Sequence, residues 1–167
     1  MQKLILIAHN VRSAHNVGSL LRSADGFGLQ KVYFTGYTPY PAAKNDSRLP
    51  HLAAKLEHQI SKTALGAQNS IAWAHQPDIY KLIDKLRSRG YLIAALEQSK
   101  TAQALPDFYS GSDLALIVGR EVEGIEPEVL QAVDTILEIP MLGKKESLNV
   151  ASAAAAALYQ LRFGLKR

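Results

Sequence analysis

Short, unbroken apolar runs recur along the chain and alternate with segments of helical periodicity. Runs without polar alternation are typical of strands that are buried on both faces of a parallel sheet. They occupy residues 4–8, 31–35, 71–74, 91–96, 114–118 and 135–140. Strands that alternate with helices in this way predict an α/β fold, with a mostly parallel sheet and helices on both of its faces.

Four of the segments between these runs carry apolar residues at helical spacing. They predict helices over residues 16–25, 49–67, 77–89 and 149–163. Ser13 fits an N-cap for the first helix, and Pro77 and Gly90 mark the ends of the third. The last helix is very rich in alanine, and residues 36–50, with three prolines, are expected to form a long loop.

Composition narrows the class of protein. The chain has 167 residues, of which 47% are hydrophobic and 20% charged, which suits one globular domain. It has no cysteine, so disulfides and thiolate chemistry are excluded. No apolar run approaches the ~20 residues of a membrane helix, and we expect a cytoplasmic protein. The net charge of +4 permits a polyanionic partner.

Several familiar chemistries find no support in the sequence. The stretch GFGLQK lacks the third glycine of a dinucleotide loop, and GKKES lacks the first glycine of a P-loop. No G-x-S-x-G elbow is present. The five histidines show no metal-ligand spacing, so no metal site is expected.

Two polar segments follow predicted strands at the end of the sheet where ligands bind in such folds. The first contains Asn16, Gly18 and Arg22, and the second places Glu121 between Gly119 and Gly124. Simpler interpretations exist for both. The first fits a capping asparagine with a surface arginine, and the second fits a turn with solvated acids.

A third segment runs from the strand that ends at Pro140 into the alanine-rich helix. It contains Gly143, and Ser147 and Asn149 stand directly before the helix. The simpler interpretation makes Ser147 the N-cap, with Asn149 in the first turn. All three segments combine small polar residues with a nearby glycine, and this repetition favours a shared site.

Taken in chain order, the three segments resemble the motifs of the SpoU/TrmH family of RNA ribose 2′-O-methyltransferases, within the SPOUT superfamily. Asn16, Gly18 and Arg22 match the first motif, and Gly119, Glu121 and Gly124 the second. Residues 139–141 (Ile-Pro-Met) and 147–149 (Ser-Leu-Asn) match the third. The match spans nearly the whole chain. It implies a deep trefoil knot in the carboxyl-terminal third, although knots are nearly absent from folded proteins.

The resemblance also implies a cofactor, S-adenosyl-L-methionine, held bent by loops of the knot. An apolar slot with a few placed polar groups suits its adenine ring. The residues expected to bind it are Leu96, Gly119, Ile139, Met141, Ser147 and Leu148. The family further implies a homodimer, in which each active site lies beside the subunit interface.

For catalysis, the resemblance places Arg22 at the centre. We expect its guanidinium to clamp a phosphate of the target nucleotide, because arginine stays protonated and makes a poor base. Asn16, Glu121, Ser147 and Asn149 are expected to orient Arg22 and the ribose.

Residues 1–167 are expected to form a single SPOUT methyltransferase domain without a separate RNA-binding domain. The substrate is then gripped by the domain itself, and a structured RNA such as tRNA is favoured over rRNA. The expected contacts are Arg12, Lys44, Arg48, Lys144 and Lys145, with Tyr37 and Tyr40 stacking on an unpaired base.

Other functions remain open at this point. The chain fits rRNA as the substrate, or a family member that binds RNA without methylating it. A flavodoxin-like nucleotide-binding domain is a further alternative, which the missing phosphate loop disfavours. A methyl transfer to a base nitrogen within the same fold is another, which the Ser-Leu-Asn motif and Arg22 disfavour.

Overall fold

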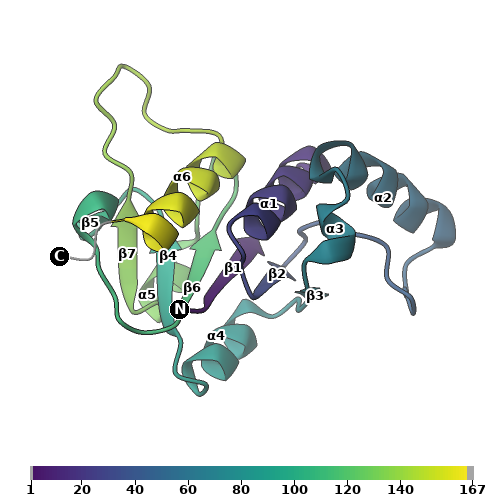
Figure 1. Ribbon diagram of the computed structural model, residues 1–167, viewed down its shortest axis with the longest axis horizontal. Coiled ribbons are helices and arrows are strands. Elements are labelled where there is room, and N and C mark those ends of the chain that lie inside the picture. Colours follow the sequence, from purple (N-terminus) through teal and green to yellow (C-terminus); the bar gives the residue numbers. More distant parts are fainter. Residues whose placement is uncertain (1, 165–167) are drawn as a thin grey trace.

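A computed structural model describes residues 2–164 and contains one seven-stranded sheet (Figure 1). All paired strands run parallel, in the order β3-β2-β1-β6-β4-β7-β5. This result confirms the α/β fold with a parallel sheet that the sequence predicts. The strands are β1 (Leu4–His9), β2 (Lys31–Thr35), β3 (Trp73–His75), β4 (Leu92–Leu96), β5 (Gln103–Ala104), β6 (Leu114–Val118) and β7 (Thr135–Glu138).

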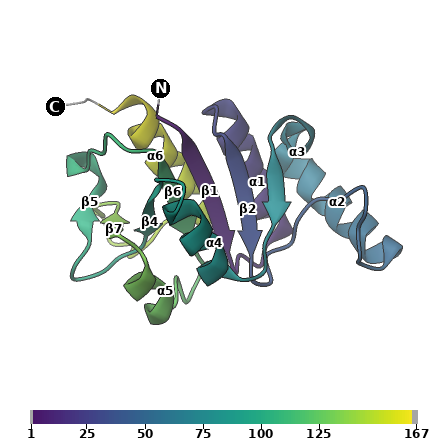
Figure 2. The same cartoon turned by 90° about the horizontal axis from the view of Figure 1, so that it is seen from below.

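Helices cover both faces of the sheet, as Figures 1 and 2 show. One face packs against α1 (Ala14–Gly26), α2 (Pro50–Ala64), α3 (Ala67–Ser70) and α6 (Val150–Phe163). The other packs against α4 (Ile79–Arg87) and α5 (Pro127–Ala132), and a short 3₁₀ turn spans Leu105–Asp107. Within residues 2–164, none of these helices has the length and apolar character needed to span a membrane.

The unbroken apolar runs are explained by the central position of β1 and β6. Every residue of both strands is buried. Along β1, Leu4, Leu6 and Ala8 belong to the core under α1 and α6, whereas Ile5 and Ile7 belong to the core under α4 and α5. Apart from the buried His9 at the end of β1, both strands are apolar throughout, because apolar cores contact both of their faces.

The element boundaries agree closely with the sequence prediction, with a few differences. The strand expected at residues 71–74 lies at Trp73–His75, and the short elements β5, α3 and α5 were not predicted. The expected helix from residue 149 begins one residue later, at Val150. The carboxyl-terminal knot and the single-domain organisation of residues 1–167 stay predictions.

Gly18 sets how closely α1 and α2 approach. A Cβ atom at this position would overlap the Thr63 hydroxyl and the backbone carbonyl of Ile60. The Thr63 hydroxyl in turn donates a hydrogen bond to the carbonyl of His15, at 2.7 Å. The close approach that Gly18 permits is therefore made by the backbone and the Thr63 side chain of α2.

We expect Gly18→Ala to lower the free energy of unfolding by about 1–3 kcal/mol, the usual cost of overpacking. This loss should outweigh the ~1 kcal/mol that alanine gains over glycine inside a helix. Urea denaturation measures the difference. Gly26→Ala is the matched control, because a Cβ atom there meets nothing within 4 Å. Equal stability of Gly18→Ala and the unmodified protein would contradict this account of the packing.

Candidate active site

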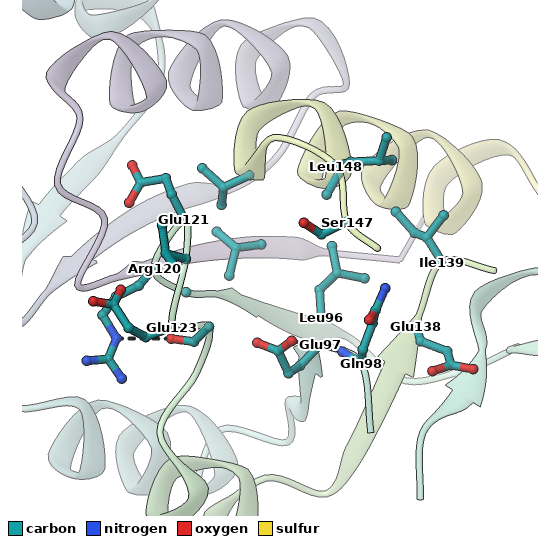
Figure 3. Close-up of a pocket in the computed structure, with 16 residues that line it drawn as sticks. Leu96, Glu97, Gln98, Arg120, Glu121, Glu123, Glu138, Ile139, Ser147 and Leu148 are labelled. Atoms are coloured by element: carbon teal, nitrogen blue, oxygen red, sulfur yellow. Dashed lines mark hydrogen bonds between the residues drawn. The ribbon is translucent and has the colours of Figure 1, made fainter. Parts of the chain in front are cut away.

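A pocket opens at the carboxyl ends of β4, β6 and β7, beside the start of α6 (Figure 3). Glu121 and Glu123 lie on one side of it, and Ile139 and Leu148 lie on the other. The loop after β6 and the loop before α6 supply much of its wall. The lining residues are Leu96, Glu97, Gln98, Val118, Gly119, Arg120, Glu121, Val122, Glu123, Gly124, Glu138, Ile139, Ser147, Leu148, Val150 and Ala153.

A chain of side-chain hydrogen bonds joins the three predicted motifs beside this pocket. The Asn149 amide donates to Asn16 Oδ1 at 3.2 Å, and the Asn16 amide donates to Glu121 Oε1 at 3.0 Å. Asn149 and Asn16 are 133 residues apart in the sequence, so only the fold brings them together. Three of the predicted catalytic residues therefore form one connected group.

The Glu121 carboxylate also binds the amino-terminal end of α1. It accepts hydrogen bonds from the backbone N–H of Ser13, at 3.2 Å, and of Arg12, at 3.4 Å. A carboxylate is favoured there by the free N–H groups and by the helix dipole. Burial alone would raise the pKa of Glu121, but the bonds from Asn16, Ser13 and Arg12 outweigh it and hold the pKa below its ordinary value.

Asn149 has two roles, because its oxygen and its nitrogen bind different partners. Its Oδ1 accepts from the N–H groups of Ala151, at 2.9 Å, and Ser152, at 3.3 Å, and so caps α6. Its Nδ2 is the atom that binds Asn16. The simpler sequence interpretation, with Ser147 as the N-cap, was therefore wrong. Ser147 lines the pocket instead.

Glu97, directly after β4, was missed by the sequence analysis. Its Oε2 accepts from the N–H of Ile125 at 2.9 Å, and its Oε1 accepts from the N–H of Gln98 at 2.9 Å. Gly124 lies against this carboxylate, and a Cβ atom at this position would overlap Glu97. Its φ of +68° also favours glycine. Glu97 thereby holds the loop after β6 in place. The available signal was its position at the carboxyl end of a buried strand.

A second polar cluster braces the same loop from the side of β1. The buried His9 imidazole lies 2.8 Å from the Thr35 hydroxyl and 3.2 Å from Glu126 Oε2. The Asn10 amide nitrogen lies 3.1 Å from His9 Nε2, and Glu126 Oε2 has no hydrogen-bond partner in the described residues. Burial lowers the pKa of His9, although the Glu126 carboxylate opposes this shift. We interpret His9 as a neutral brace.

The predicted cofactor residues line the pocket, with the exception of Met141. Leu96, Gly119 and Ile139 lie at the ends of strands, and Ser147 and Leu148 lie at the start of α6. After Ile139 the chain leaves the wall and enters an exposed loop that projects from the body of the molecule (Figure 1). Met141 lies on that loop, outside the pocket lining, and its role in binding the cofactor stays a prediction.

Arg22 is not among the pocket-lining residues. It is exposed on α1, six residues beyond Asn16 and so about 9 Å further along the helix axis. Within residues 2–164, the structure gives it no hydrogen bond and no ion pair. Its guanidinium is therefore available for a ligand that reaches across α1 from the pocket.

Two of the predicted RNA contacts are engaged inside the protein. The guanidinium of Arg48 donates to Asp46 Oδ1 at 2.8 Å and to the carbonyls of Tyr40 and Pro41, both at 2.9 Å. It also lies 3.7 Å from the centre of the Tyr40 ring, whose stacking partner is His75 at 4.2 Å. Arg48 and Tyr40 thus stabilise their own loop, which corrects their predicted role.

The other predicted contacts remain on the surface. Lys44, Lys144 and Lys145 are exposed. Arg12 is exposed and pairs with Glu123 at 3.3 Å. Its guanidinium lies 6.0 Å from the centre of the Tyr37 ring, which is 52% exposed. These four cations and Tyr37 keep their predicted role as RNA contacts.

We expect Glu121→Gln to lower the free energy of unfolding by about 1–2 kcal/mol at pH 7, because a neutral amide accepts weaker hydrogen bonds. The folded pKa of Glu121 lies below the ordinary 4.5. The ionised group therefore stabilises the folded state above the unfolded pKa, and this contribution is lost as the pH falls through the folded pKa. Denaturation at pH 7 and pH 3 should show the difference between variant and unmodified protein shrinking.

Glu123→Gln is the matched control for this prediction. The Glu123 side chain is 44% exposed, so its pair with Arg12 should contribute less than ~1 kcal/mol. A difference for Glu121→Gln that stays constant between the two pH values would contradict the assignment of the shifted carboxyl group.

Comparison with known proteins agrees with the motif assignment. A tRNA (guanosine(18)-2′-O)-methyltransferase of Aquifex aeolicus is 29% identical over 94% of this chain and 67% of its own length. A TrmH family tRNA/rRNA methyltransferase of Staphylococcus haemolyticus is 27% identical over 94% of this chain, which spans 57% of that relative. An AdoMet-bound rRNA methyltransferase from Sinorhizobium meliloti shares the fold, with a TM-score of 0.80, 20% identity and coverage of 99% of this chain and 57% of the other.

The model of the SpoU rRNA Methylase family matches residues 3–159, which is nearly all of the sequence. The same stretch contains Asn16, Glu121 and Asn149, the residues that the structure joins beside the pocket. The chain therefore belongs to the SpoU/TrmH family of RNA methyltransferases.

Proposed function

We propose that this protein transfers a methyl group from S-adenosyl-L-methionine to a ribose 2′-hydroxyl of RNA, in the cytoplasm. The observation that carries the proposal is the hydrogen-bonded group of Asn149, Asn16 and Glu121, which joins three distant motifs beside one pocket that Glu121 lines. The family match over residues 3–159 supports methylation of RNA as the reaction class. The Aquifex aeolicus relative, a tRNA (guanosine(18)-2′-O)-methyltransferase, supports the 2′-hydroxyl as the acceptor.

The pocket fits the cofactor chemically. Leu96, Val118, Ile139 and Leu148 supply apolar surface for an adenine ring. At Gly119 a Cβ atom would overlap the side chain of Ile125, so this glycine lets the turn after β6 pack closely on itself and shape the pocket wall. Glu97, Glu121, Glu123 and Glu138 line the same pocket and complement a positively charged ligand. AdoMet-bound structures among proteins of the same fold support this assignment.

The cofactor supplies a methyl group on a positively charged sulfur. The protein must then hold the ribose in line with this methyl and help to remove the proton of the hydroxyl. In this proposal Arg22 binds the phosphate next to that ribose, since a guanidinium matches phosphate geometry. Asn149 and Ser147 orient the ribose from the start of α6, while Asn16 and Glu121 fix the position of Asn149.

For the substrate, we propose tRNA. The Aquifex aeolicus relative, which is named for its action on a guanosine of tRNA, aligns with 94% of this chain. rRNA is the second candidate, because the Sinorhizobium meliloti neighbour and the family model carry rRNA in their names. Methyl transfer from labelled S-adenosylmethionine to unmodified bulk tRNA and rRNA, followed by nucleoside analysis, tests both the reaction and the RNA. A methylated base nitrogen would overturn the proposed acceptor.

Arg22→Ala should lower methyl transfer by more than a hundredfold while leaving the affinity for S-adenosylmethionine unchanged. The reason is that Arg22 is not a pocket-lining residue. Single-turnover methylation measures the first effect, and calorimetric titration with the cofactor measures the second.

Arg89→Ala is the control for charge, because Arg89 is exposed directly after α4, on the other face of the sheet. It should retain nearly full activity. If Arg22→Ala transfers methyl within about tenfold of the unmodified protein, roughly 1.4 kcal/mol of barrier, Arg22 is not the phosphate clamp.

We further propose that the protein is a homodimer that buries the outer face of α6. Ser152, Ala156, Tyr159 and Phe163 form an exposed stripe without any charge, at spacings of four, three and four residues. Tyr159 and Phe163 are 58% and 59% exposed, and both contact the Phe27 ring edge-on. A second copy would remove this aromatic surface from water.

Ala156→Glu should convert the dimer to a monomer, since it places a charge in the middle of the stripe. Light scattering at micromolar concentration measures the mass. Ser88→Glu, on the opposite face of the sheet, is the control and should remain dimeric. A monomeric unmodified protein would contradict the dimer directly.

A further inference from the structure

The solvent face of α2 carries a continuous row of basic side chains. His51, Lys55, His58 and Lys62 follow one another at spacings of four, three and four residues, so they lie in one line along the helix. All four are exposed. With a rise of 1.5 Å per residue, the row extends over about 16 Å. The row lies opposite the buried residues Ala53, Ile60 and Ala64.

No acidic group in the described residues neutralises this row. Lys55 and Lys62 form no ion pair within residues 2–164. The one acidic residue of α2, Glu57, is half-buried and turns inward, where it accepts from the N–H of Ala42, at 2.8 Å, and from the Gln68 amide, at 3.3 Å. Four donors therefore face water without a counter-charge, which suits an extended anion.

The position of α2 connects this row with the active site. In Figures 1 and 2, α2 projects beyond β3, the edge strand farthest from the pocket strands β4 and β7. A groove lies between α2 and the loop after β2, and its lining includes Leu56, Gln59, Tyr37 and Arg12. Arg12 in turn pairs with Glu123, which lines the pocket. One surface thus leads from the pocket across the groove to α2.

The groove offers the second kind of contact that RNA requires. Tyr37 is half-exposed at its mouth, and Arg12 lies beside its ring. A flat aromatic surface with a neighbouring guanidinium binds an unpaired base by stacking. Tyr40 is not available for this, because Arg48 and His75 already contact its ring.

We propose that the His51–Lys55–His58–Lys62 row of α2 binds the phosphate backbone of the substrate RNA, while Tyr37 holds an unpaired base in the adjoining groove. The inference rests on the proposed function, because it assumes an RNA substrate. Both lysines bind phosphates as charges, and each imidazole can donate an N–H to a phosphate oxygen. The helix then serves the single domain as its RNA-docking surface, away from the chemistry.

The test is a double variant, Lys55→Gln with Lys62→Gln. Its affinity for the unmodified substrate RNA is measured by fluorescence anisotropy at several salt concentrations. Loss of two phosphate contacts should weaken binding about tenfold at low salt and reduce the slope of log K against log[salt] by about 1.4–1.8. The methylation rate at saturating RNA and the affinity for S-adenosylmethionine should remain unchanged. Lys55→Arg with Lys62→Arg should bind like the unmodified protein.

Lys81→Gln with Lys85→Gln is the matched control, because these lysines are exposed on α4, which covers the other face of the sheet. The control removes the same charge and should leave the salt slope unchanged. If both double variants lose RNA affinity equally, the effect comes from net charge alone, and the inference is overturned. An unchanged slope in the α2 variant would also overturn it.

The docking surface and the proposed function can be tested separately. If the unmodified protein methylates RNA but the α2 variant binds it normally, only the docking surface is wrong. If the unmodified protein neither binds nor methylates tRNA or rRNA, the proposed function fails, and the docking surface fails with it. Tyr37→Ala, tested with a fully paired and a looped RNA, should weaken only the looped one, and equal effects on both would remove Tyr37 from the docking surface.

Discussion

A single carboxylate, that of Glu121, holds together the parts from which the site is built. It accepts hydrogen bonds from two backbone N–H groups at the start of α1 and from the side-chain amide of Asn16. Asn16 in turn accepts a hydrogen bond from Asn149, which is the N-cap of α6. The loop after β6 and the starts of two helices are therefore fixed to one charged group. Since charge-assisted bonds are the strong ones, this group can order a region that has little apolar packing of its own.

The parallel sheet explains why these parts meet. All strands end at the same side, so the loops after β1, β4, β6 and β7 are neighbours in space although they are distant in sequence. Glu97 and the His9–Glu126 pair secure the loop after β6 from two further directions. The apolar strands thus place the loops at one edge of the sheet, and the polar groups at the strand ends fix the conformation of these loops. The pocket depends on both.

Much of this arrangement could be predicted from the sequence, and the misses have physical reasons. Buried strands and capped helices can be predicted because each has a local sequence pattern. β5 has two residues and α3 has four, so both are too short to show a periodicity. The motif residues Asn16, Glu121 and Asn149 were found because their pattern spans the chain. Glu97 stands alone in sequence, and Arg48 has its partners in a loop whose path no local pattern reveals. Met141 lies outside the pocket lining because the chain leaves the pocket after Ile139, at a point that only the fold defines.

The contact at Gly18 has a consequence for how such a protein changes over generations. α1 and α2 meet through backbone atoms, so the position of α2 does not depend on the identity of the side chains on its outer face. Those side chains can be replaced one at a time without moving the helix that carries Asn16 and Arg22. For the proposed docking surface, this means that RNA affinity can change by substitution on α2 while the geometry of the active site is preserved.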